Sequence, residues 1–235
     1  MKILKILLIV LLIVGLLAGA AIWYLSEPKP VGTDPARGDA LAQKMLTALN
    51  KPGWDTLQVL TWTFPGGHSY IWDKQANKAI ITWADHEVEM LLDDQSGSAT
   101  TNGIVQTGPD KEGLLQKAWN MWCNDSFWMM APYKVFDPGT TRTIVSHEGK
   151  DALLVTYESG GVTPGDQYLW ILGDDYIPTA FKMWVKIIPI GGVLFTWEGW
   201  TDLPSGAKVS TTKKSAMFPL QLSGVSEANT VQEVK

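Results

Sequence analysis

The chain has 235 residues, 18% of them charged, and a formal net charge of −5. Lys2 and Lys5 precede a long apolar segment, and removing their two positive charges leaves about −7 on the part from Ser26 onward. An acidic domain without a basic stripe argues against nucleic acid as a partner. The single cysteine, Cys123, excludes an internal disulfide and any metal site that needs a cysteine pair.

Residues 6–25 form an uncharged, strongly apolar run, long enough to cross the ~30 Å hydrocarbon core of a bilayer as a helix. Lys2 and Lys5 lie before this run, which predicts that the N-terminus stays in the cytoplasm and the rest of the chain is exported. We therefore expect residues 1–26 to be a transmembrane anchor. Residues 27–35, rich in Pro and Gly, are expected to be a short, stiff linker.

A cleaved signal peptide is the alternative to an anchor, since Ala18-Gly19-Ala20 matches a small-residue cleavage site. Cleavage there would leave the apolar segment 21–25 as the new N-terminus, which an anchor explains better. No cysteine follows the run directly, so a lipidation site at its end is excluded. Both interpretations place the following domain outside the cytoplasm.

Residues 36–235 are expected to form one domain that is mainly β with some α. Apolar residues at helical spacing predict helices over 39–50 and 111–122. From Trp54 onward the apolar spacing changes to two, with hairpin signals between the runs, which predicts about ten antiparallel strands in a meander. We expect a curved sheet with the two helices packed on it.

Sequence motifs for catalysis and cofactor binding are weak. His68, His86 and His147 lack the spacing of a metal site, and no GxSxG segment is present. The carboxylate pairs Asp93-Asp94 and Asp174-Asp175 fall in predicted turns, where carboxylates cap the backbone or stay solvated. We expect no catalytic residue, no metal and no cofactor.

The tryptophans are the informative feature, because 12 of them occur in this chain. An indole buries a large area and carries an N–H that needs a partner, so a closed core is an awkward place for many of them. They would suit a concave sheet around an apolar cavity, or they could fill the space between sheet and helices. The cavity interpretation assigns five to the wall: Trp62, Trp72, Trp83, Trp170 and Trp197.

The segment 124–137 combines polar residues with a run of large apolar ones, which is unusual for a loop. It can be interpreted as a lid or rim, with Phe127, Trp128 and Met129 closing over an apolar ligand, or as a buried crossover that plugs the sheet.

Two sets of segments resemble a known family. The strand Asp166-Gln167-Tyr168-Leu169-Trp170-Ile171 ahead of Tyr176-Ile177-Pro178, with the element order above, is similar to the lipoprotein-carrier fold of the LolA and LolB type. The stretch Asn124-Asp125-Ser126-Phe127-Trp128, followed by Pro132-Tyr133-Lys134 and Asp137-Pro138-Gly139, resembles uncharacterised exported proteins of Bacteroidetes-type bacteria.

The resemblance implies an incomplete barrel closed by helices around a cavity that receives acyl chains, and it supplies no catalytic residues. It suggests a periplasmic, non-enzymatic protein, anchored in the cell inner membrane by one helix, that binds a lipid or lipoprotein acyl chain. A fixed acceptor fits the anchor better than a shuttling carrier. The alternative is an interaction module with a self-filled core that binds another envelope protein.

Overall fold

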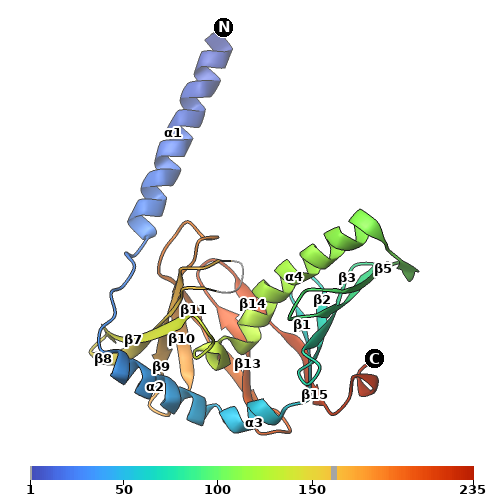
Figure 1. The fold of residues 1–235 in the computed structure, drawn as a ribbon. Helices are drawn as coiled ribbons and strands as arrows, with labels where there is room; N and C mark the ends of the chain where they lie inside the picture. The colour runs from blue at the N-terminus through green and yellow to red at the C-terminus, as the bar shows by residue number, and fades with distance from the viewer. Residues whose placement is uncertain (1, 160–162) are drawn as a thin grey trace.

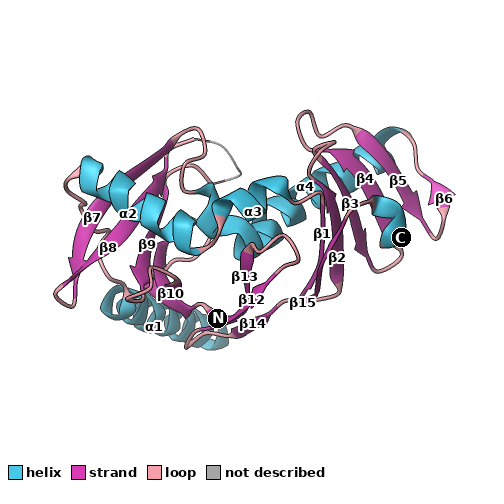
Figure 2. Ribbon diagram, turned by 90° about the horizontal axis from the view of Figure 1, so that it is seen from below, coloured by secondary structure: helices cyan, strands magenta, loops and turns pink. Residues whose placement is uncertain are grey.

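The computed structural model describes residues 2–159 and 163–235. Within these ranges the chain forms four α-helices, two 3-10 helices and fifteen strands (Figures 1 and 2). The helices are α1 (Lys2–Leu25), α2 (Pro35–Ala48), α3 (Lys51–Thr56), α4 (Gly108–Met130), η1 (Ala131–Lys134) and η2 (Val231–Glu233). The apolar helix α1 stands away from the rest of the chain (Figure 1).

Two larger sheets and one small sheet make up the β structure. A seven-stranded sheet contains β1 (Val59–Phe64), β2 (His68–Asp73), β3 (Lys78–Trp83), β4 (His86–Leu91), β5 (Gly97–Thr101), β6 (Ile104–Val105) and β15 (Ser223–Ala228). A five-stranded sheet contains β7 (Thr140–His147), β8 (Lys150–Tyr157), β9 (Asp166–Leu172), β10 (Pro178–Trp184) and β11 (Val193–Thr196). The third sheet contains β12 (Glu198–Asp202), β13 (Lys208–Lys214) and β14 (Pro219–Gln221).

Antiparallel meanders are confirmed, because β1 to β6 and β7 to β11 each follow one another in their sheet. The single curved sheet of about ten strands is replaced by three open sheets, and none of them closes into a barrel within the described residues. One reason is visible at Trp197. The apolar spacing over 193–201 predicts one continuous strand, but the strand is interrupted at this residue, and its halves β11 and β12 pair in different sheets. An apolar pattern alone does not reveal such a change of partner.

The first predicted domain helix corresponds to α2, which begins four residues before the expected start. The Asp34 side chain accepts a hydrogen bond from the Arg37 N–H at 3.0 Å and caps the helix. In the fold, α2 lies against β7 and β8.

The second predicted helix was too short. Helix α4 continues past Trp122 to Met130, so the segment expected to be an apolar loop or lid is helical. Asn124, Asp125 and Ser126 are poor helix formers, which concealed this continuation. The helix crosses between the two larger sheets (Figure 2), and burial on several sides explains why apolar residues do not keep to one face of it.

Candidate functional site

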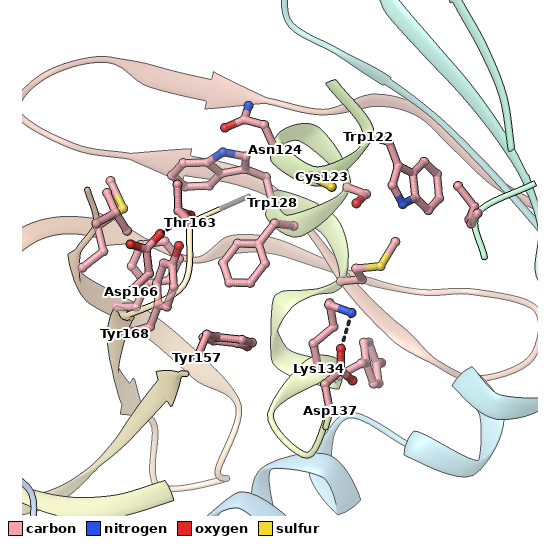
Figure 3. A pocket seen from close by; sticks show the side chains of 18 of the residues that line it. Trp122, Cys123, Asn124, Trp128, Lys134, Asp137, Tyr157, Thr163, Asp166 and Tyr168 are labelled. Atoms are coloured by element: carbon pink, nitrogen blue, oxygen red, sulfur yellow. Dashed lines mark hydrogen bonds and ion pairs between the residues drawn. The ribbon is translucent and has the colours of Figure 1, made fainter. Parts of the chain in front are cut away.

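A cavity of about 560 Å³ lies beside the C-terminal half of α4. Its wall also receives residues from the seven-stranded sheet and from β8, β9 and β10, together with the turn after β10. Figure 3 shows Trp122 and Trp128 leaving α4 on opposite sides in that view, with Tyr157 and Tyr168 beyond Trp128. A cavity of this size falls in the range of small-molecule sites.

Helix α4 contributes a stripe of side chains at helical spacing. Residues three and four positions apart share one face of a helix, and the stripe runs from Trp119 to Met130. Its members in the cavity wall are Trp119, Trp122, Cys123, Ser126, Phe127 and Met130. The opposite wall includes Tyr168, Phe181 and Met183, so the cavity is mainly apolar with aromatic surfaces on two sides.

Polar groups lie at two places in this wall. Lys134 forms an ion pair with Asp137, drawn as a dashed line in Figure 3. Asp166, which is buried, accepts hydrogen bonds from the Thr163 hydroxyl at 2.6 Å and from the Lys186 N–H at 3.1 Å. These carboxylates already have partners, so they are suited to orienting a ligand headgroup rather than to acid–base chemistry.

Two buried donors in the wall have no hydrogen-bond partner among the described residues. They are the indole N–H of Trp72 and the hydroxyl of Tyr157. Burial raises the pKa of Tyr157 well above its usual value, so the hydroxyl remains protonated. A buried donor without a partner is costly, and both donor atoms lie beneath the surface of the cavity wall.

A buried polar network holds α4 against β2. The Asp125 carboxylate, 2% exposed as a residue, accepts a hydrogen bond from the Tyr70 hydroxyl at 2.5 Å and lies 2.8 Å from Nδ1 of His68. Burial, together with the neighbouring carboxylate, raises the pKa of Tyr70 well above its usual range, so it stays a donor. This network positions the stripe on α4.

The cavity brings together three of the eight residues that the sequence singled out: Trp72, Phe127 and Trp128. The other five are buried and do not line it: Trp62, Trp83, Trp170, Trp197 and Met129. The tryptophans among them pack on other aromatic rings instead; the ring centroids of Trp170 and Trp197 are 5.0 Å apart, and those of Trp62 and Tyr70 are 4.7 Å apart. Alternation identifies the enclosed face of a strand but not whether the space above it is filled.

Most residues of the cavity wall are not among those that the sequence singled out. Tyr168 shares the phase of Trp170 in β9, and Trp119, Trp122, Cys123 and Met130 follow the helical stripe, so a signal for these residues was present. Tyr133 comes from the short helix η1, and Ile187 and Ile188 come from a turn, where no periodicity points to a site.

Among the described residues, no group of three or more His, Cys, Asp or Glu side chains comes together in a way that could hold a metal ion.

No known protein family matches the sequence, and no curated protein matches it. Among solved structures, the chain is similar to a domain from Vibrio parahaemolyticus assigned to outer membrane lipoprotein sorting. The alignment has 8% sequence identity and a TM-score of 0.37, and it covers 86% of this chain and 96% of that one. A likeness of this degree has no weight for the function, which is inferred below from the geometry.

Proposed function

We propose that this protein binds an acyl chain of a lipid or lipoprotein, without converting it, while α1 tethers it to a membrane. The cavity of about 560 Å³ carries this proposal, because its mainly apolar wall is left open by the fold. An acyl chain gains ~0.8 kcal/mol for each methylene that leaves water, so an apolar wall can supply the affinity without many specific polar contacts.

Membrane tethering is supported by the helix Leu7–Leu25, which is long and apolar enough to cross a bilayer and in which none of the described side chains is buried in the fold. A cleaved signal sequence has the same length and composition. The tether places residues 1–26 in and beside the membrane, and residues 36–235 form the binding domain. The positive-inside rule then puts this domain outside the cytoplasm, on the periplasmic side of the inner membrane in a two-membrane cell.

The binding residues in this proposal differ from the eight that the sequence singled out. Phe127, Trp128 and Trp72 remain, and Trp122, Tyr168 and Met183 join them. The polar group Lys134 and Asp137 would face the headgroup or the glycerol ester. The alternative is an interaction module whose core is filled by its own side chains. Such a module does not account for an open cavity.

Photo-crosslinking tests the proposal. The full chain is placed in bilayer nanodiscs that contain a phospholipid with a diazirine at the end of one acyl chain, and the crosslinked peptides are identified by mass spectrometry. Crosslinks on α1 are expected from its position in the bilayer and serve as the internal reference. Additional crosslinks on the α4 peptide around Trp128 and on the β10 peptide around Met183 would support the proposal. Crosslinks confined to α1 would contradict it and favour the interaction module.

A matched pair of variants sharpens this experiment. Val185→Trp adds bulk inside the cavity and should lower the α4 and β10 crosslinks while leaving those on α1 unchanged. Thr141→Trp adds the same side chain at an exposed site on β7 and should change neither. Thermal unfolding of both variants verifies that each remains folded.

A further inference from the structure

The chain directly after α1 is bound to the turn between β10 and β11. The Glu27 N–H donates to the Gly191 carbonyl at 2.9 Å, and the Gly191 N–H donates to the Ser26 hydroxyl at 2.8 Å. The indole N–H of Trp184 donates to the Glu27 carbonyl at 2.9 Å, and the Lys182 ammonium lies 2.8 Å from the Glu27 carboxylate. The segment expected to be a short, stiff linker is therefore fastened to the domain at its start.

Two glycines make this close approach possible. A Cβ on Gly191 would lie 2.6 Å from a ring carbon of Trp184 and 2.7 Å from the Glu27 carbonyl oxygen. Gly192 has a φ of +78°, and a Cβ there would lie 2.7 Å from the Glu27 Cβ. Glycine thus suits both positions, and the contact between linker and turn is built into the fold.

The position of this contact fixes the distance from the turn to the membrane. Leu25 ends α1 and Ser26 is already hydrogen-bonded to the turn. Consecutive Cα atoms are about 3.8 Å apart, so the β10–β11 turn lies within one or two residues' reach of the point where α1 leaves the hydrocarbon.

The turn has the composition of a membrane-contacting segment. It reads Lys186-Ile187-Ile188-Pro189-Ile190, and Ile187 is 68% exposed. Further exposed apolar side chains lie on β11 and just before β14: Leu194, Met217 and Phe218. The Phe218 ring is 5.2 Å from that of Phe195, which is buried on the other face of β11 from Leu194. Exposed apolar side chains that gather on one surface mark contact with a membrane or a partner.

The same turn also borders the cavity. Ile187 and Ile188 line it together with Val185, and because Ile187 is exposed as well, it lies at the rim. The cavity rim and the segment nearest the membrane are therefore one stretch of chain.

We propose that the turn Lys186–Ile190 rests in the interface of the bilayer that α1 crosses, so that the rim of the cavity faces this bilayer and an acyl chain enters from it directly. Contact with the membrane depends only on α1 spanning the bilayer, whereas acyl entry rests on the proposed function. The turn contacts the lipid surface rather than a protein, because the hydrogen-bonded segment after α1 keeps the turn close to the membrane.

Site-specific fluorescence tests the membrane contact. The full chain carrying Ile187→Cys is labelled with an environment-sensitive fluorophore and reconstituted in vesicles containing phospholipids spin-labelled near the headgroup. The matched control is Gln43→Cys, an exposed position on α2 at the end of the domain away from α1 (Figure 1). The unsubstituted chain is the labelling blank, since burial raises the pKa of the Cys123 thiol to about 11 and leaves little reactive thiolate at neutral pH.

Loss of most of the fluorescence at position 187, with little change at position 43, would support membrane contact. Equal quenching at both positions, or quenching at neither, would overturn it. These outcomes do not depend on whether the cavity binds an acyl chain.

A second pair of variants tests acyl entry. Pro189→Asp places a charge at the exposed tip of the turn without altering the cavity wall, and Pro189→Leu keeps the tip apolar. Pro189→Asp should keep the binding of a fluorescent fatty acid supplied in detergent micelles but take up a fluorescent phospholipid from vesicles several-fold more slowly. Pro189→Leu should resemble the unsubstituted chain in both assays. Unchanged uptake by Pro189→Asp would overturn direct entry, whereas absence of binding in micelles by the unsubstituted chain would overturn the proposed function itself.

Discussion

Two aromatic regions of this molecule use the same residue types in opposite ways. Around Trp170 and Trp197 the rings close on one another, and both side chains are fully buried or nearly so. Around Trp72 and Trp128 the rings are half-buried and line an open cavity. The closed region belongs to the core of the five-stranded sheet, whereas the open region lies where α4 meets both larger sheets.

A high tryptophan content therefore does not by itself indicate a ligand site. The closed region tolerates indole N–H groups without partners among the described residues, as in Trp170 and Trp197. The area that an indole buries is large enough to outweigh one unsatisfied donor. What makes the second region a candidate site is unfilled volume beside it.

Truncating one tryptophan in each region should give the largest contrast. Trp170→Ala removes a completely buried indole and is expected to lower the free energy of unfolding by about 3–5 kcal/mol. Trp128→Ala shortens a side chain that already borders a cavity, so it should lower the free energy of unfolding by a smaller amount. It should also weaken acyl binding. Unfolding of the full chain, followed by circular dichroism in detergent, measures the first effect, and fatty-acid titration measures the second. Equal losses of stability in both variants would contradict the distinction between closed and open regions.

A buried lysine in the closed region offers a test through pH. Lys213 is 0% exposed, with its ammonium 4.4 Å from the Trp197 ring centroid and donating to the Ser210 carbonyl at 2.6 Å. Burial lowers the pKa of Lys213 to about 7. In the unfolded chain the group keeps its ordinary pKa of about 10.4, so between these values the unfolded state binds more protons than the folded state.

Stability should therefore rise as the pH increases from about 7 toward 10, because the penalty for a buried charge is full below the folded pKa and disappears above the unfolded one. Lys213→Met removes the charge at similar volume and is expected to stabilise the fold by about 1–4 kcal/mol at pH 6, with less gain at pH 9. Thermal unfolding of both chains across this pH range measures the difference. A gain that is the same at both pH values would show that Lys213 is not buried as an uncompensated charge.

The smallest expected effect concerns the open region. Tyr157→Phe deletes a buried hydroxyl without a partner among the described residues, so the free energy of unfolding should stay the same or rise slightly. If a ligand oxygen accepts from this hydroxyl, binding should weaken by about 0.5–1.5 kcal/mol. Calorimetric titration with a fatty acid compares the two chains. Tyr176→Phe, at an exposed position outside the cavity, is the control. A loss of stability in Tyr157→Phe with unchanged binding would argue against a ligand contact there.

Much of the local structure follows from the sequence because it depends on local patterns. The apolar run of α1, the helix α2 and the hairpins of both meanders are visible as periodicity and turn residues, which arise from backbone geometry. The candidate site was only partly predictable. Phe127 and Trp128 were assigned to a rim, and they do line the cavity, but from a helix rather than a loop.

Composition and apolar spacing alone indicate an acidic, tryptophan-rich, mainly β domain behind an apolar N-terminal helix, because both are local properties of the chain. The tertiary structure decided three further points. Asp125 keeps α4 helical through a poor helix-forming segment by pairing with His68 and Tyr70, which lie more than fifty residues away. The chain changes sheets at Trp197. Side chains fill the space over Trp170, whereas a cavity remains beside Trp128. This difference depends on which side chains from distant parts of the chain pack at each place.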